Sequence, residues 1–576
     1  GPAMNGMLFE TFGGRPGKTT AFVRDDGTVA TMRMAMDHHA EGIWALLQVA
    51  RDHRTEILRD AQAVVAEAVA DARAGDQRTV ILPASGPGID PDKTERLVER
   101  LVLQGVEVRR VDGAFSARAR DYLSTDGARD ERFPAGTYVI DLVQPNARLA
   151  RALLDPTLDY SDPQVETPYG QKMPYYDSSW GNLPLVFGVR AYASKAAPPA
   201  GAQLVPDWPM DRIARAQHRG LSRAEPAYAY VLPAGRESSY RTTVALMNEG
   251  FRVRVFSAPF RIGETTYPKG TFALIRQRNG DALPERIRAL GQQHGATVVE
   301  VAGPFTDAGV TFGDEARLPA VPAPLVAVVA DWPVAQDHIF GGIRTTLQTD
   351  FGFPFTPVMM ETVNRADLSR YTAVVLPHAG MDVRGGPGFE AGYRGLLQVE
   401  NLRRYVQGGG TVIAMKGAGE LLAADEVLGR GVDFEGYAEH TNGTILRAEW
   451  MAAPILPDSE TTTWRPGLTE VGMPLLGAGF ERTEFAAPGL YPVRLTVRPD
   501  AGARVVARYT PDAARLLMDG YMLESDKPVV AGSPFAVVQN VGRGRVIYLA
   551  DDITFRGQWY GLNQLFMNAL VLGPLL

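Results

Sequence analysis

The sequence predicts an α/β fold that is divided among several domains. The chain has 576 residues, whereas a single hydrophobic core stops growing at about 250 to 300 residues. Apolar runs of strand length alternate with amphipathic runs of helical period along most of the chain. ARLPAVPAP (316–324) contains three prolines in nine residues, which indicates a linker between domains.

The first predicted domain covers residues 1–76. NGMLFETFGG (5–14) is typical of a strand, and AFVRDDGTVATMRMAM (21–36) predicts two extended runs joined by an Asp-Gly turn. Apolar residues then recur at helical spacing, which predicts a long helix with Asp37 as its N-cap and Gly75 as its end. A strand, a hairpin and a long helix are how an α/β domain ordinarily finishes.

An internal repeat organises the second predicted domain, residues 77–318, into two copies at about 78–155 and 226–303. TVILPASG (79–86) matches YAYVLPAG (228–235), and PAGTYVIDL (134–142) matches PKGTFALIR (268–276). Each copy predicts a strand, a helix ended by glycine, two further strands and a helix. The sequence therefore predicts a duplicated α/β unit.

The third predicted domain covers residues 324–576. It begins with the apolar run LVAVVADWP and continues through further apolar strands and the amphipathic helix QVENLRRYVQGGG. Such alternation favours a parallel, doubly wound sheet. Short alternating runs between about 425 and 540 predict a β-rich insertion.

Composition excludes several function classes. The formal net charge of −7, with Lys and Arg scattered along the chain, argues against nucleic-acid binding. No apolar run reaches the roughly 18 residues that a membrane helix requires. Because the sequence contains no cysteine, disulfides, thiolate metal sites and cysteine nucleophiles are all excluded.

TVIAMKGAGELL (411–422) has the strand, sharp turn and helix pattern of a nucleophile elbow. The third domain resembles the class I glutamine amidotransferase-like fold, in which this turn presents a cysteine. Here Lys416, Gly417 and Ala418 occupy the turn. Glutaminase chemistry of that kind is therefore excluded. The turn either has a purely structural role or forms a ligand site at the helix N-terminus near Gly417.

Two sets of side chains are candidates for catalysis or metal binding near the N-terminus. His38-x-x-Glu41 has a spacing that allows two side chains to reach one zinc ion, but no third ligand is placed beside it, and polar residues at a helix start are the simpler interpretation. Glu10 lies in an apolar strand. It is either a carboxylate at an exposed strand end or a base whose pKa is raised by the flanking residues Met7, Leu8, Phe9 and Phe12.

Four ordered segments resemble the large bacterial zinc carboxypeptidases, which are carboxypeptidase A-like metallopeptidases. NGMLFETFGGRPGK followed by TVATMRMAMDHHAEGIWALLQVARDHRTEIL resembles the closing part of their catalytic domain, where a G-x-L-x-E strand carries the catalytic glutamate. AGTYVIDLVQPNARLARALLD and MPYYDSSWGNLPLVFGV resemble their accessory regions.

The resemblance implies that Glu10 is the general base and proton shuttle of a peptidase that acts on peptide or protein C-termini. In the family the zinc ligands, an H-x-x-E pair and a later His, precede the glutamate strand; His38-x-x-Glu41 follows it, so no ligand role is transferred. We therefore expect zinc in a parent protein, held by an upstream segment, and no catalytic zinc or hydrolysis by this chain alone. The resemblance also implies export to the periplasm or beyond.

Two other functions remain open. The chain could be a non-catalytic peptide- or glycan-binding or scaffolding protein, with the aromatic stretch TPYGQKMPYYDSSWGNLP (167–184) as its contact loop or packed between domains. Trp180→Ala would distinguish the two roles of that loop. A hydrolase site in the duplicated region would use Ser85, Ser238, Ser239 or Asp177, although no Gly-x-Ser-x-Gly elbow accompanies them.

Overall fold

The computed structural model is a mixed α/β structure with several sheets, as the sequence predicts. The structure describes residues 9, 21–24, 26–86, 88–156, 165–166, 172–173, 180–206, 227–335, 339–379, 393, 395–424, 430–438, 441–455, 475–480, 482–498 and 501–576. No helix among these residues is both long and apolar enough to cross a membrane.

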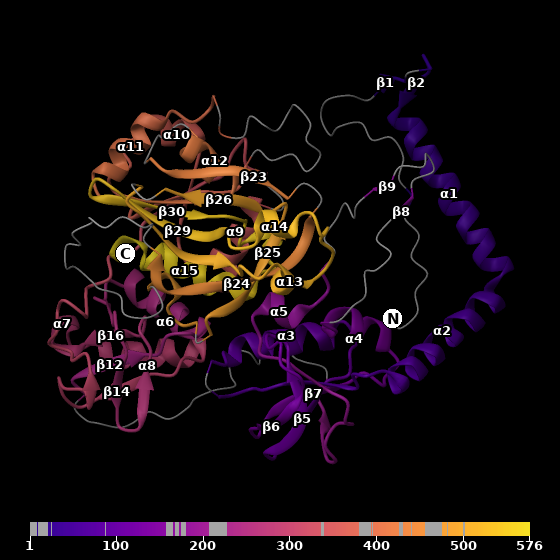
Figure 1. Cartoon of the computed structure of the whole chain (residues 1–576), viewed down its shortest axis with the longest axis horizontal. Helices are drawn as coiled ribbons and strands as arrows, with labels where there is room; N and C mark the ends of the chain where they lie inside the picture. Colours follow the sequence, from indigo (N-terminus) through magenta and orange to yellow (C-terminus); the bar gives the residue numbers. More distant parts are fainter. Residues whose placement is uncertain are drawn as a thin grey trace.

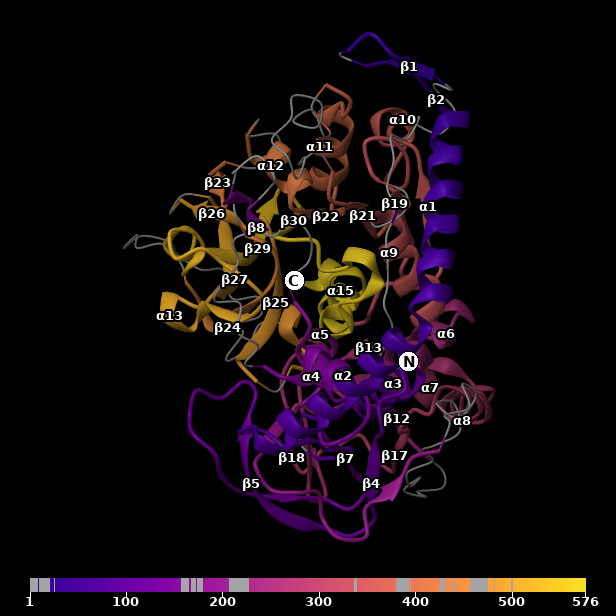
Figure 2. The same cartoon turned by 90° about the vertical axis from the view of Figure 1, so that its right-hand side faces the viewer.

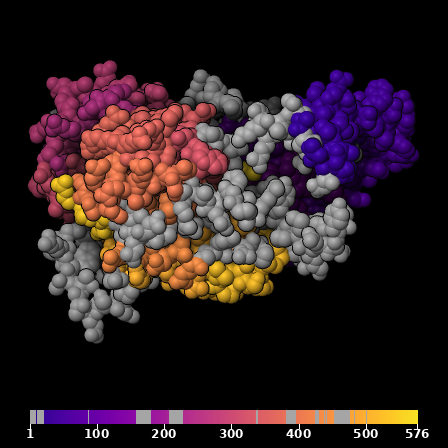
Figure 3. Space-filling model, turned by 90° about the horizontal axis from the view of Figure 1, so that it is seen from above, coloured from indigo at the N-terminus to yellow at the C-terminus, as the bar shows by residue number. Residues whose placement is uncertain are grey.

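The N-terminal elements form an arm at one side of the molecule (Figures 1 and 3). Strands β1 (Ala21–Val23) and β2 (Val29–Thr31) form the predicted antiparallel hairpin, and helices α1 (Met32–Asp52) and α2 (Arg54–Ala74) follow. The prediction of Asp37 as N-cap was wrong. The cap is Thr31, whose Oγ1 accepts the N–H of Met34, because the second extended run ends there and the helix begins at once. Gly75 ends α2, as predicted.

The first α/β unit is a seven-stranded sheet in the order β11-β4-β7-β3-β10-β5-β6. Its strands are β3 (Thr79–Leu82), β4 (Arg109–Val111), β5 (Phe115–Asp121), β6 (Arg129–Phe133), β7 (Thr137–Asp141), β10 (Tyr192–Ser194) and β11 (Gln203–Leu204). Its helices are α3 (Pro91–Leu103), α4 (Ala147–Leu154) and α5 (Leu183–Phe187). A separate strand pair, β8 (Val165–Glu166) and β9 (Lys172–Met173), lies between α4 and α5 in the chain.

The second unit has a four-stranded sheet in the order β13-β16-β12-β17 and a three-stranded sheet β15-β14-β18. The strands are β12 (Ala229–Leu232), β13 (Arg254–Val255), β14 (Phe260–Ile262), β15 (Thr265–Tyr267), β16 (Phe272–Ile275), β17 (Val299–Val301) and β18 (Ala308–Gly309). The helices are α6 (Glu237–Asn248), α7 (Arg276–Asn279) and α8 (Leu283–His294).

The two units share strand order and register. Leu82 pairs with Tyr138 across β3 and β7, and Leu232 pairs with Phe272 across β12 and β16. These four residues occupy matching places in the repeated sequence segments. In each unit the strand after the first helix, β4 or β13, pairs antiparallel on the far side of β7 or β16. The sequence repeat therefore has a counterpart in how the strands pair.

The third region contains a ten-stranded sheet whose two halves differ in direction, and a separate pair of strands, β23 and β26. Its parallel half has the order β20-β19-β21-β22-β30, and the antiparallel strands β29, β27, β24 and β25 continue it. The described part of 425–540 is rich in strands, and most of them extend this sheet. The strands of the region are β19 (Val326–Val329), β20 (Thr356–Val358), β21 (Ala373–Leu376), β22 (Thr411–Met415), β23 (Val432–Tyr437), β24 (Asn442–Ile455), β25 (Glu484–Leu490), β26 (Val493–Val497), β27 (Ala503–Tyr509), β28 (Leu517–Asp519), β29 (Pro534–Val541) and β30 (Gly544–Leu549).

Helices cover both faces of the parallel half. Alternate residues of β19 face opposite ways: Val326 and Val328 belong to one apolar cluster, and Ala327 and Val329 to another. The first cluster includes residues of α9 and α15, and the second includes residues of α10, α11 and α12. The helices of this region are α9 (Gly341–Arg344), α10 (Met360–Arg365), α11 (Val399–Gln407), α12 (Gly417–Ala424), α13 (Ala513–Leu516), α14 (Lys527–Val530) and α15 (Asn563–Val571).

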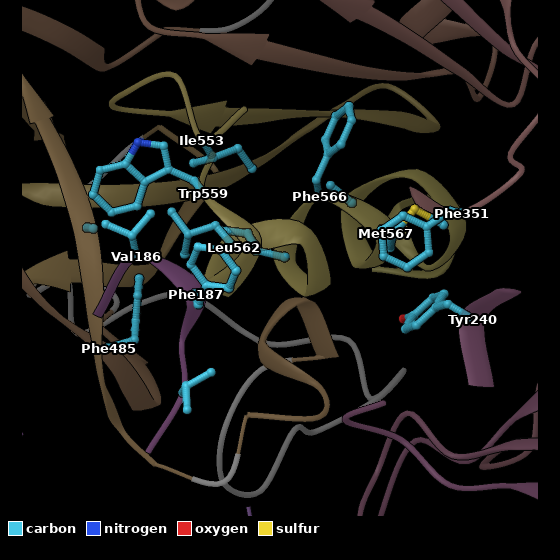
Figure 4. Packing of buried hydrophobic residues seen from close by; sticks show 14 of the residues in the cluster. Val186, Phe187, Tyr240, Phe351, Phe485, Ile553, Trp559, Leu562, Phe566 and Met567 are labelled. Carbon is cyan, nitrogen blue, oxygen red and sulfur yellow. The ribbon is translucent and has the colours of Figure 1, made fainter. Parts of the chain in front are cut away.

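Helix α15 joins the three regions through one core. Every residue of α15 is buried, and the amides of Gln564 and Asn568 donate to the backbone carbonyl oxygens of Leu476 and Ala478. Figure 4 shows Met567 of α15 and Phe351 near Tyr240 of α6, while Phe187 of α5 lies beside Leu562. Figure 2 shows α15 between the third sheet and the helices of the first unit. The junction around α15 is therefore where a site shared by all three regions could form.

Candidate functional site

Glu10 lies outside the described residues, but its neighbour Phe9 does not. A Cβ added to Gly42 of α1 would come within 2.8 Å of the Phe9 ring, so this ring lies directly against α1.

His38, His39 and Glu41 are exposed side chains in α1. The described residues contain no group of three His, Cys, Asp or Glu side chains arranged to hold a metal ion. The described part of the chain therefore does not supply a zinc site of the kind that the resemblance implies.

The turn at Lys416 has the geometry of an elbow. Lys416 has a left-handed φ of 43° between β22 and α12, and its side chain is buried. The ammonium donates to the Leu490 carbonyl oxygen and lies 3.4 Å from Asp551 Oδ1. A Cβ on Gly417 would come within 2.2 Å of the Ala379 oxygen, so backbone already fills the space beside the helix start. The contacts of this turn are those of an architectural element.

A second buried carboxylate follows Asp551 at the same edge of the sheet. Asp552 Oδ1 accepts the N–H and the hydroxyl of Thr554, while Asp552 Oδ2 is buried without a partner. Burial raises the pKa of Asp552 to about 6, and the neighbouring charge of Asp551 adds to the shift. A carboxyl that titrates close to neutral pH therefore lies at the carboxyl end of β30.

The candidate serines lie in two places. Ser238 and Ser239 are buried in the first turn of α6, and the N–H of Ser238 donates to Asp92 Oδ2. Ser85 lies in the loop after β3, and Asp177 lies outside the described residues. Among the described residues, no hydrogen bond joins Ser85, Ser238 or Ser239 to a histidine.

The start of α6 meets the start of α3, which the sequence did not indicate. Asp90, the N-cap of α3, accepts the N–H of Asp92 and also the N–H of Glu237 in α6. Glu237 in turn accepts from Arg96 and Arg241. Burial, together with the charges of Asp92 and Glu237, raises the pKa of Asp90 to about 7. Two carboxylates at the start of α3, Asp90 and Asp92, thus accept the N–H groups at the start of α6.

Beside these helix starts lies a cavity of about 320 Å³ at the junction of the three regions. Close glycine contacts set its walls. A Cβ on Gly188 would come within 2.7 Å of Gly561 Cα, and a Cβ on Gly479 within 2.6 Å of the Gly235 nitrogen. All four glycines line the cavity. Since their lack of a side chain lets the backbones meet, these positions tie the first and second units to the third region.

An ion cluster lies on one side of this cavity. Arg482 donates through both terminal nitrogens to Asp121, and Arg190 Nε lies 3.6 Å from Asp121 Oδ2. Burial opposes the charge of Asp121, but the hydrogen bonds and charge of Arg482 outweigh it and lower the pKa of this carboxyl. The lining also includes the apolar side chains of Phe480 and Phe485. The arrangement resembles a ligand pocket with a few convergent polar groups in an apolar setting.

Trp180, from the aromatic stretch, packs inside the junction. Its ring centroid is 5.2 Å from that of Trp559 and 6.5 Å from that of Phe555, both in edge-to-face geometry. The backbone N–H of Trp180 donates to the Gly443 carbonyl oxygen. The rest of residues 167–179, apart from β9, lies outside the described residues. Trp180 itself is thus a packing residue, which is one of the two roles open for that stretch.

Comparisons with known proteins do not assign a family. No family model matches the chain, and no curated protein matches it. A β-galactosidase from Bacillus circulans sp. alkalophilus matches at 17% identity and a TM-score of 0.26, over 43% of this chain and 31% of the galactosidase. A cytoplasmic protein from Salmonella typhimurium LT2 matches at 12% identity and a TM-score of 0.25, over 43% of this chain and 98% of that protein. A carbohydrate deacetylase matches at 14% identity and a TM-score of 0.26, over 43% of this chain and 32% of the deacetylase. Likenesses this weak carry no argument about function.

Proposed function

We propose that this chain is the carboxyl-terminal portion of a zinc metallocarboxypeptidase, a hydrolase that removes residues from the C-terminus of a peptide or protein. In this proposal, residues 1–76 complete the catalytic domain and Glu10 is its general base. Residues 77–318 form a duplicated accessory domain, and residues 324–576 form an amidotransferase-like domain that has lost its nucleophile. The parent protein is exported.

The uncovered apolar face of α1 carries the proposal. Helix α1 has no buried residue, although its sequence has apolar residues at helical spacing. Ile43 is 52% exposed, Trp44 63% and Leu47 57%. Burying three such side chains is worth several kcal/mol, so a helix of this composition ordinarily packs against a sheet. A preceding part of the catalytic domain would cover this face.

The position of Phe9 agrees with this role. The Phe9 ring contacts Gly42, one residue before the exposed Ile43 and Trp44. Glu10 follows Phe9 directly, so a domain that covered α1 would also surround Glu10. The ligands of the zinc would then come from that domain, since the described residues contain no group that could hold the ion.

The test uses the parent protein, expressed with the coding sequence upstream of residue 1. We expect one zinc per chain by elemental analysis and release of C-terminal residues from a peptide, followed by mass spectrometry. Glu10→Gln should retain the zinc and lose at least 100-fold in activity, because a positioned base contributes about 10²- to 10⁴-fold. The control, Glu41→Gln, should retain both.

Three results would contradict the proposal. The parent protein could contain no zinc, or Glu10→Gln could remain active. The 576-residue chain by itself could bind stoichiometric zinc and trim a peptide. Loss of zinc in Glu41→Gln would instead assign the metal to the His38-x-x-Glu41 pair.

A second candidate function is a non-catalytic binding protein. The cavity at the junction favours it, because a preformed concave pocket with an apolar wall and charged groups is the usual form of a small-ligand site. Ligand binding at the cavity is also compatible with the peptidase proposal, since the cavity and Glu10 belong to different parts of the chain.

A further inference from the structure

The cavity at the junction has more hydrogen-bond donors than the protein itself uses. We propose that it binds a small organic anion, namely a carboxylate attached to an apolar body. The inference rests on the second candidate function, binding, and does not depend on the zinc peptidase.

The acceptors that line the cavity already have partners. Both oxygens of Asp90 accept backbone N–H groups, and both oxygens of Asp121 accept from Arg482. Glu484 accepts from Arg515 through Oε1 and from Arg447 through Oε2. The Tyr122 hydroxyl donates to the Leu154 carbonyl oxygen. A cationic ligand would therefore find its natural partners occupied.

The donors in the same walls are only partly used. Arg190 Nε is buried without a hydrogen-bond partner, and its 3.6 Å approach to Asp121 is an ion pair without a hydrogen bond. The Lys93 side chain is buried, yet its ammonium has one long contact of 3.5 Å to the Gly561 carbonyl oxygen. A buried cation with spare N–H groups is costly unless it gains an acceptor.

The guanidinium groups at the ion cluster suit a carboxylate ligand. Arg190 and Arg482 line the cavity beside Asp121, while Arg447 and Arg515 bind Glu484 from outside the lining. Guanidinium groups form paired hydrogen bonds with carboxylates, so a carboxylate would supply the acceptor that Arg190 Nε lacks.

The apolar residues of the lining determine which kind of organic group the cavity can hold. Leu185, Leu562, Phe480 and Phe485 line the cavity, and Phe485 belongs to the aromatic group that includes Trp450 at 5.0 Å. The close glycine contacts fix the walls before a ligand enters, which limits the entropy lost on binding. A cavity of about 320 Å³ is at the small end of ligand sites. An aryl or branched alkyl carboxylate therefore suits it better than a nucleotide or a long peptide.

The experiment is calorimetric titration of the whole chain with N-acetyl-L-phenylalanine, with its neutral amide, and with inorganic phosphate. We expect binding of the acid, at least tenfold weaker binding of the amide, and no binding of phosphate. Equal affinity for acid and amide, binding of phosphate alone, or no binding of the acid would each overturn the proposal.

Variants locate the site. Arg482→Gln should weaken binding of the acid at least tenfold, and Ala486→Phe should abolish it by filling the cavity without changing a charge. The matched control is Arg365→Gln, since Arg365 is an exposed arginine that pairs only with exposed Glu361, and it should bind as wild type. Circular dichroism checks that each variant is folded. Unchanged binding by folded Ala486→Phe would place the ligand elsewhere and refute the inference. These outcomes are separate from those of the peptidase test, which follows zinc and peptide trimming in the parent protein.

Discussion

Replacing Trp180 by alanine should destabilise the junction of the three regions without changing any charged side chain. The Trp180 ring lies edge-to-face against Trp559, which is fully buried, and against Phe555. The neighbouring N–H groups of Gly181 and Asn182 both donate to Asp519 at 2.8 Å, so the backbone holds this ring in place. The substitution therefore leaves a space between the first unit and the third region.

The expected loss follows from the burial of the ring. A fully buried tryptophan costs about 3 to 5 kcal/mol when it becomes alanine. Trp180 is only partly buried, so we halve the transfer contribution and retain the aromatic pair contribution of about 0.5 to 1.5 kcal/mol. The free energy of unfolding should fall by about 2 to 4 kcal/mol.

The assay is urea unfolding followed by far-ultraviolet circular dichroism. The matched control is Trp44→Ala, because Trp44 is 63% exposed in α1 and should change the unfolding free energy by less than about 0.5 kcal/mol. If Trp180→Ala and Trp44→Ala unfold at the same urea concentration, the packing role of Trp180 is wrong. A folded Trp180→Ala that loses ligand binding at full stability would instead support recognition by this stretch.

Two further predictions concern the buried charges at the carboxyl ends of β22 and β30. Lys416→Met should lower the unfolding free energy by about 3 to 5 kcal/mol, because it leaves Asp551 buried without its cation. Adding Asp551→Asn to the Lys416→Met chain should restore part of the loss. If urea unfolding shows no change in stability for Lys416→Met, the pairing is refuted. Asp552 has a raised folded pKa of about 6, so the folded state retains a proton that the unfolded chain releases, and this group lowers stability as pH rises from about 4 to about 6. Asp552→Asn should remove this contribution. The unfolding free energy of the variant, relative to that of the wild type, should therefore rise between about pH 4 and about pH 6 by at most about 3 kcal/mol. A difference in unfolding free energy that does not depend on pH would contradict the raised pKa of Asp552.

Sequence patterns correctly predicted those elements whose formation depends on neighbouring residues. The apolar runs at 80–82 and 326–329 form strands because consecutive apolar residues can be buried on both faces of a sheet. Gly75 ends α2 because glycine disfavours continuing a helix. The same rules missed the start of α1, since alternating apolar residues in MRMAM also suit a strand, and Thr31 caps the helix only because the hairpin ends there.

By itself, the sequence determined the mixed α/β class, the repeat of two similar units and the absence of any thiol chemistry, because these depend on periodicity and residue type. Only the tertiary structure decided which charged groups meet. Asp90 accepts the N–H of Glu237, and Asp121 binds Arg482, although each pair is far apart in the chain. Such contacts depend on how the three sheets pack around α15, and packing gives no periodic signal along the chain. The cavity, and the hydrogen-bond donors in its walls that the protein uses only in part, form at that junction for the same reason.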